Sequence, residues 1–195
     1  MPDGPLAEFG AAWLGWDPRI GKRAETLDIP NLPKNLYKLT KSARKYGLHG
    51  TLKPPFRLKT TYAEQDLIHS FEEFCADEGP AISGKIVLQA IGGFLALIPE
   101  QSLDQIDRLA RNCVTFFDSY RAPLDSKELE KQQERPLSIN QQKMLTKWGY
   151  PYVFNEFQFH ITLIGRVSQS EADHILKILQ PDLESKLNDS LKIAK

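Results

Sequence analysis

The chain has 195 residues, of which 41% are hydrophobic and 26% charged, and this is ordinary for a globular protein with one sizeable core or two small lobes. Its 25 basic and 25 acidic side chains cancel, so no overall positive field is available to hold long nucleic acid. The sequence shows neither a basic-then-apolar leader nor an apolar run of about 18 residues, which predicts no membrane span and favours the cytoplasm.

Two cysteines, Cys75 and Cys113, fall within apolar helical patterns. We therefore expect buried free thiols rather than a disulfide. The sequence contains no Cys-x-x-Cys pair and no dense group of histidines and cysteines, so neither a structural metal nor a cofactor is expected.

The N-terminal half alternates helical patterns with loops and one strand. The expected elements are, in order, a helix over residues 6–16, a loop over 17–34, one or two helical turns over 35–45, a strand over 46–52 and a helix over 61–79. The strand should stop at Lys53-Pro54-Pro55, because proline cannot donate to a sheet ladder. Thr61 and Glu64 form a capping box that should open the second long helix.

The C-terminal half predicts a hairpin followed by helices and one more strand. The expected elements are strands over 83–91 and 94–98, a helix from 102 to about 117, a solvated helix or loop over 125–137, a helix over 138–148, a strand within 153–167, a helix over 168–180 and a weakly docked helical tail over 183–195. Gly92-Gly93 should form the hairpin turn. Capping boxes at Ser102 and Ser138 should open two of the helices, and Pro181 should end the helix over 168–180.

Two short apolar segments, 46–52 and 157–163, each place a histidine and a threonine two residues apart. The residues concerned are His49, Thr51, His160 and Thr162. Because side chains alternate along a strand, each histidine should share one face with its threonine while the apolar residues occupy the other. With four histidines and eight threonines in the chain, two such pairs arise by chance in about one chain in a hundred.

Two imidazoles and two hydroxyls suit attack at phosphorus. Histidine titrates near neutrality, so one ring can take a proton while the other gives one. A threonine hydroxyl can donate to a phosphate oxygen as charge develops there. A metal site at the histidines is a weaker interpretation, since Glu156 is the nearest carboxylate in sequence to either motif.

Tandem His-x-Thr motifs on strands are the signature of the 2H phosphoesterase superfamily, which this chain resembles. It is most similar to the DUF1045 branch, whose members are associated with phosphonate metabolism. The resemblance runs from about Leu6 to Val167. Besides the motifs, it is carried by Lys53-Pro54-Pro55-Phe56-Arg57, Gly92–Leu97, Arg121–Leu124 and Trp148–Phe154.

The resemblance implies a single bilobal α+β domain over residues 1–195. Two antiparallel sheet lobes would be related by a pseudo-twofold axis around a central cleft, with helices outside. It implies that His49 and His160 form the acid/base pair and that Thr51 and Thr162 contact the phosphate. Family members begin with an apolar strand before the first helix. This sequence starts at Met1-Pro-Asp-Gly without one, so we expect lowered stability or homo-oligomerisation through the open edge.

Five further residues are candidates for binding the substrate. Lys53, Arg57 and Arg121 could hold a second phosphate, although solvated surface charges explain them about as well. Tyr46 and Tyr152 could stack a ribose or base at the rim of the cleft, although packing is an alternative role for both.

Together these features predict a metal-independent cyclic phosphodiesterase, a hydrolase that opens a small ribose or nucleoside cyclic phosphate in phosphonate metabolism. One alternative is a non-catalytic or regulatory module that binds a sugar phosphate without turning it over. The other is an enzyme that processes 2′,3′-cyclic phosphates at RNA ends, against which the neutral net charge argues mildly. The expected partner is a small phosphorylated sugar or nucleotide, with neither membrane nor long nucleic acid.

Overall fold

The computed structural model describes residues 4–101, 104–134, 136–184, 187 and 191–193. The chain divides into two compact units, which are described in turn. Unit 1 comprises Met1–Thr51, Ser83–Ser102 and His160–Leu191, and unit 2 comprises Leu52–Ile82, Leu103–Phe159 and Lys192–Lys195. Helices and two small antiparallel sheets confirm the expected α+β class.

A three-stranded antiparallel sheet forms the centre of unit 1. Its strands lie in the order β2 (Ile86–Ile91), β3 (Phe94–Pro99) and β4 (Ile161–Ile164). The hairpin between β2 and β3 turns at Gly92-Gly93, whose φ angles of 53° and 85° are those that a two-residue hairpin loop requires. The hairpin expected from the sequence is therefore confirmed.

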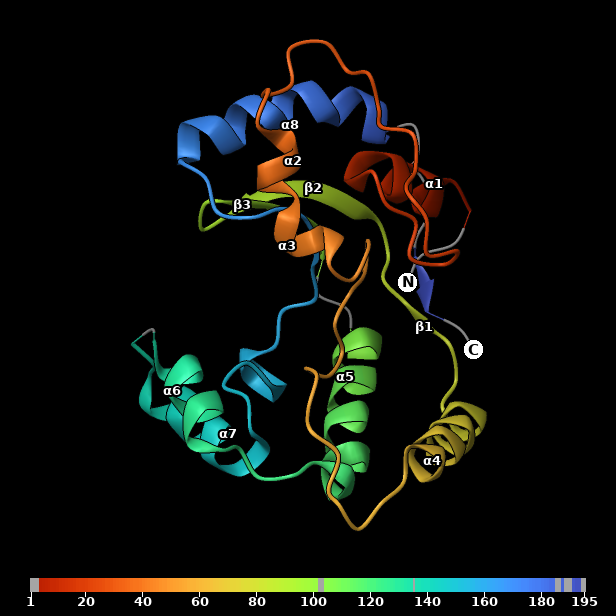
Figure 1. Ribbon diagram of the computed structural model, residues 1–195, viewed down its shortest axis with the longest axis vertical. Coiled ribbons are helices and arrows are strands. Elements are labelled where there is room, and N and C mark those ends of the chain that lie inside the picture. The colour runs from red at the N-terminus through yellow and green to blue at the C-terminus, as the bar shows by residue number, and fades with distance from the viewer. Residues whose placement is uncertain (1–3, 102–103, 135, 185–186, 188–190, 194–195) are drawn as a thin grey trace. The chain divides into compact units, whose positions relative to one another are not determined.

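Helices cover the sheet of unit 1. The long helix α8 (Gln169–Glu184) runs along β2 and β3, as Figure 1 shows. Its inner face consists of buried aliphatic side chains, namely Ala172, Ile175, Leu179 and Leu183. The short helices α2 (Leu36–Leu39) and α3 (Lys41–Arg44) lie near the end of β4, where the Gly165 amide donates to the Leu39 carbonyl at 2.8 Å.

Helix α1 (Gly4–Leu14), the N-terminal helix expected from the sequence, is tied to β4 at a bulge. Leu95 pairs with Ile164 and Ala96 pairs with Thr162, so Leu163 is an extra residue in β4 without a ladder partner. The indole Nε1 of Trp13 donates to the Leu163 carbonyl oxygen at 3.0 Å. Trp13 is buried, so this bond satisfies a polar group that the bulge leaves without its usual partner.

Unit 2 is mainly helical. It contains α4 (Glu64–Asp77), α5 (Asp104–Phe116), η1 (Phe117–Tyr120), α6 (Ser126–Gln133), α7 (Ile139–Trp148), η2 (Phe154–Glu156) and a two-stranded sheet of β1 (Ala81–Ile82) with β5 (Lys192–Ile193). The Phe74 ring on α4 lies 5.1 Å from the rings of both Phe116 and Phe117. These aromatic contacts join α4 to the end of α5.

The capping predictions had different outcomes. At α7 the Ser138 hydroxyl accepts from the Gln141 amide at 3.1 Å, and the Gln141 side chain accepts from the Ser138 amide at 3.0 Å, which confirms the predicted capping box. Helix α4 is instead capped two residues later than expected, at Ala63 rather than Thr61, where an Asp66 carboxylate accepts from the Ala63 amide at 2.7 Å. The predicted cap at Ser102 lies outside the described residues.

Three expected elements differ from those in the structure. Helix α8 continues through Pro181 to Glu184, because the buried Leu183 extends its apolar stripe beyond the proline. The described part of the tail forms strand β5 rather than a helix, and it pairs with β1, which the sequence did not predict. Segment 46–52 is not a strand, since Gly47 adopts a left-handed φ of 74° and only an isolated bridge at Gly50 follows.

Both cysteines are free, as expected, and Cys113 is buried on α5. Burial, with smaller contributions from Glu78 and Cys75, raises the pKa of the Cys113 thiol from 9.0 to about 11. Because the thiolate is the reactive form, we expect iodoacetamide at pH 8 to label Cys113 about 100-fold more slowly in the native protein than in urea. Mass spectrometry of timed samples measures both rates. Equal native and unfolded rates would contradict this burial.

Candidate functional site

The second His-x-Thr segment lies at the start of strand β4. Phe159, Ile161 and Leu163 are 8%, 2% and 0% exposed, whereas His160 and Thr162 are only half-buried. The predicted alternation is therefore confirmed here, with apolar side chains in the core and the imidazole and hydroxyl outside it.

The sheet of unit 1 extends the surface around His160. Thr162 pairs with Ala96, which pairs in turn with Gln89, so these three residues share one face of the sheet. The Phe94 ring, on the same face of β3, lies 5.7 Å from the His160 ring. This face offers a small residue, an exposed amide and an aromatic ring next to the second motif.

The first His-x-Thr segment is held by packing against the N-terminal part of unit 1. Leu48 is buried against Gly10 of α1, where a Cβ atom would lie 2.7 Å from the Leu48 Cβ. The next residue, His49, donates from its ring Nδ1 to the Gly47 carbonyl oxygen at 2.9 Å. Tyr46 meets the same ring edge-on at 5.6 Å. The backbone turn at Gly47 and the ring of Tyr46 therefore orient His49.

An isolated antiparallel bridge joins the two segments through Gly50 and Ile161. In an antiparallel pair, residues that flank a bridge come opposite each other, so His49 faces Thr162 across the register and Thr51 faces His160. The structure thus brings together the four residues that the sequence singled out. It does so within unit 1, with one motif on a strand and the other on a loop, rather than on two equivalent strands.

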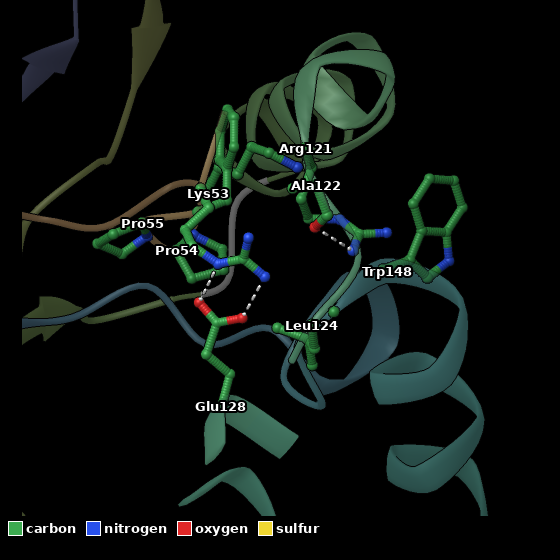
Figure 2. Close-up of a pocket in the computed structure, with 11 residues that line it drawn as sticks. Lys53, Pro54, Pro55, Arg121, Ala122, Leu124, Glu128 and Trp148 are labelled. Atoms are coloured by element: carbon green, nitrogen blue, oxygen red, sulfur yellow. Dashed lines mark hydrogen bonds and ion pairs between the residues drawn. The ribbon is translucent and has the colours of Figure 1, made fainter. Parts of the chain in front are cut away.

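Three other predicted site residues, Lys53, Arg57 and Arg121, line a pocket in unit 2, shown in Figure 2. Its walls also include Pro54, Pro55, Phe56, Ala122, Leu124, Glu128, Trp148 and Gly149. Tyr152, the last predicted binding residue, lies outside this lining, and its ring packs edge-on against Tyr150 at 5.5 Å.

The two arginines of the pocket already have carboxylate partners. Arg57 donates from Nε and Nη2 to the two carboxylate oxygens of Glu128, both at 3.0 Å, and this contact holds the pKa of Glu128 below its usual range. Arg121 donates to Asp118 at 2.8 Å and to the Lys147 carbonyl oxygen at 3.2 Å. Each arginine therefore has a carboxylate partner within unit 2, and this contact does not decide between the two roles that the sequence left open.

Lys53 has a different environment. Burial lowers the pKa of its ammonium group, and the nearby charge of Arg121 acts in the same direction against the opposing effect of Asp118. Its Nζ donates to the Val114 carbonyl oxygen near the C-terminal end of α5, at 3.2 Å. A lysine is favoured at that end of a helix dipole, so part of its role is structural.

Sequence reasoning missed three residues near these sites. Glu128 lies in the polar stretch interpreted as solvated, yet the spacing Asp125-x-x-Glu128 is itself a capping signal that could have placed it at the start of α6. Gly10 and Phe94 gave no comparable signal, because their importance depends on contacts with Leu48 and His160.

The described part of the chain carries neither a metal-binding cluster nor a membrane span. No group of three or more histidine, cysteine, aspartate or glutamate side chains there could hold a metal ion. Among the described helices, none combines the length and apolar character needed to cross a membrane.

Comparison with known proteins gives one family and two relatives. The family model described as a protein of unknown function, DUF1045, matches residues 51–195. The chain is 38% identical over 179 residues to the ribose 1,5-bisphosphate phosphokinase PhnN of Janthinobacterium sp. (strain Marseille), covering 91% of this chain and 40% of that protein. It is 27% identical over 162 residues to the protein of the same name from Laribacter hongkongensis (strain HLHK9), covering 83% and 37%. No solved structure matches.

These relatives correct one prediction and confirm another. Both are named as kinases, which are transferases, so the prediction of a hydrolase is wrong. The chain spans less than half the length of each relative. The narrower family resemblance is confirmed, because the family match covers well over half of the sequence: the chain belongs to the DUF1045 family.

Proposed function

We propose that this chain is a binding module for a phosphorylated pentose of the ribose 1,5-bisphosphate type, held at the two His-x-Thr segments of unit 1. The bridge between Gly50 and Ile161 carries the proposal, because its register sets each histidine opposite the threonine of the other segment. The names of the two relatives supply the class of ligand. This is the sugar-phosphate-binding alternative raised by the sequence, and it fits a role in phosphonate metabolism.

The chemistry of the four side chains suits an anion. Because the Nδ1 of His49 donates to the Gly47 carbonyl, Nε2 carries a proton only when the ring is an imidazolium, and it then offers a charged donor to phosphate. The two threonine hydroxyls add neutral donors that can rotate toward phosphate oxygens. Hydrogen bonds between a charged donor and phosphate are about twice as strong as neutral ones, so an imidazolium in this site would contribute more to the affinity than a threonine hydroxyl.

One segment of the sequence resembles a nucleotide-binding loop but does not have the structure of one. Residues 79–86 read Gly-Pro-Ala-Ile-Ser-Gly-Lys-Ile, which matches a phosphate-binding loop except that Ile86 replaces the serine or threonine. In such loops a helix follows the lysine, whereas here strand β2 begins at Ile86. Lys85 is paired with Glu100 at 3.2 Å. Phosphoryl transfer from a nucleotide is therefore not part of this proposal.

Calorimetric titration tests the proposal. Ribose 1,5-bisphosphate should bind more tightly than ribose 5-phosphate, and unphosphorylated ribose should not bind. His49→Ala and His160→Ala should each weaken binding of the bisphosphate by about 10- to 100-fold, the loss expected for one charge-assisted hydrogen bond.

The matched control is His174→Ala, because His174 is exposed on α8 of the same unit and belongs to neither motif. This variant should bind the bisphosphate like the unmodified chain. The proposal fails if both motif variants retain full affinity, or if ribose competes as well as its phosphates do.

A further inference from the structure

In the pocket of unit 2, two parallel N–H donors of the Arg57 guanidinium are both used by the carboxylate of Glu128. The Arg57 guanidinium holds both Glu128 oxygens at 3.0 Å and also donates to the Pro123 carbonyl oxygen at 2.7 Å, as the dashed lines in Figure 2 mark for the carboxylate. A guanidinium recognises a carboxylate and a phosphate with the same pair of parallel donors. Glu128 therefore occupies a position that a phosphate group could take.

Exposure makes this internal pair easy to replace. The side chains of Arg57 and Glu128 are 50% and 34% exposed. Ion pairs in such positions contribute little to stability, because water solvates both partners and screens their attraction. A ligand anion that reaches Arg57 therefore competes with a weak contact rather than with a buried one.

Glu128 also has a second hydrogen-bond partner, which it keeps if a ligand replaces it at Arg57. Its Oε2 accepts from the Asp125 amide at 2.9 Å, and the Asp125 carboxylate accepts from the Glu128 amide at 2.8 Å. This reciprocal capping box closes the first turn of α6. Displacing the carboxylate from Arg57 leaves the cap of the helix satisfied, so exchange does not require α6 to unfold.

The lining is rich in basic side chains, two of which also have carboxylate neighbours just outside it. Lys53, Arg57 and Arg121 line the pocket together with one acidic residue, Glu128. Asp118 pairs with Arg121 at 2.8 Å, and Asp125 lies 3.8 Å from Arg57. Lys53 is partly desolvated, and its ammonium group donates to the uncharged Val114 carbonyl. An anion that lies beside Lys53 and Arg57 would interact with both charges at short range, where screening is weakest.

We propose that this pocket is a second anion site that takes a phosphomonoester or inorganic phosphate, with Glu128 as the resident carboxylate that the ligand displaces from Arg57. Pro54, Leu124 and Trp148 form apolar walls beside the charged groups and would contact the organic part of the ligand. The site is independent of the His-x-Thr segments, so neither proposal rests on the other.

The test uses inorganic phosphate as the probe and the full chain carrying His49→Ala and His160→Ala, which weakens any binding at the His-x-Thr segments of unit 1. Calorimetry is run at constant ionic strength. Glu128→Gln keeps a side chain that can complete the capping box but removes the competing charge, so phosphate should bind about tenfold more tightly. Arg57→Lys keeps the positive charge but loses the two parallel N–H donors of the guanidinium, and it should weaken phosphate binding about tenfold.

The matched control is Glu130→Gln, an exposed carboxylate on the same helix that does not line the pocket, and it should leave the affinity unchanged. Phosphate should also shift the NMR signal of the Arg57 Nε–Hε group. The proposal is overturned if Glu128→Gln binds phosphate no more tightly than Glu130→Gln. It is equally overturned if saturating phosphate leaves the Arg57 signal in place.

Discussion

Gly47→Ala is expected to lower the free energy of unfolding by about 3 kcal/mol and to abolish sugar-phosphate binding at the His-x-Thr segments. Gly47 has a left-handed φ of 74°, which costs an alanine about 1–2 kcal/mol. A Cβ there would also lie 2.3 Å from the Pro18 Cγ, within a ring that cannot swing aside. Because the Gly47 carbonyl accepts from His49, any shift of this turn moves the imidazole.

Gly21→Ala provides the matched control, since Gly21 has a similar φ of 62° but no atom lies within 4 Å of the position that its Cβ would take. It should therefore show only the backbone cost. Urea unfolding followed by circular dichroism gives both free energies, and the difference between them measures the contact with Pro18. Equal losses in the two variants would show that the Pro18 contact relaxes freely.

Trp13→Ala is expected to destabilise the protein by about 3–5 kcal/mol, as is usual for loss of a large buried aromatic side chain. The ring is 3% exposed and stacks with Phe9 at 6.1 Å. Trp13→Phe retains most of the packing but leaves the Leu163 carbonyl at the bulge without its donor, which should cost about 1–3 kcal/mol. The two variants thus separate packing from the hydrogen bond.

Trp16→Ala is the comparison for this series, because Trp16 follows the same helix but is only half-buried. Its loss of stability in urea should be clearly smaller than that of Trp13→Ala. If Trp13→Phe were as stable as the unmodified chain, the bond to Leu163 would contribute nothing and the bulge would be held by packing alone.

Local signals predicted much of the fold. The hairpin at Gly92-Gly93 and the cap at Ser138 were correct because each depends on residues close in sequence, whose backbone geometry or side-chain hydrogen bonds define the element. The alternation around His160 was correct for the same reason, since a strand beside a core must bury every second side chain.

Predictions failed where distant contacts outweighed local preference. Pro181 should end a helix, yet buried Leu183 beyond it keeps α8 intact to Glu184. Strands β1 and β5 pair although about half the chain separates them, and neither two-residue strand has a pattern of its own. Segment 46–52 has the apolar alternation of a strand, but the turn at Gly47 against Pro18 takes it out of the sheet.

By itself the sequence determined which side chains carry the candidate chemistry, because His49, Thr51, His160 and Thr162 stand out through a repeated spacing that local periodicity explains. Only the tertiary structure decided how they meet, since the bridge from Gly50 to Ile161 joins segments more than a hundred residues apart. It also decided that Arg57 faces Glu128, because an ion pair between a loop and a helix depends on packing that no local pattern records.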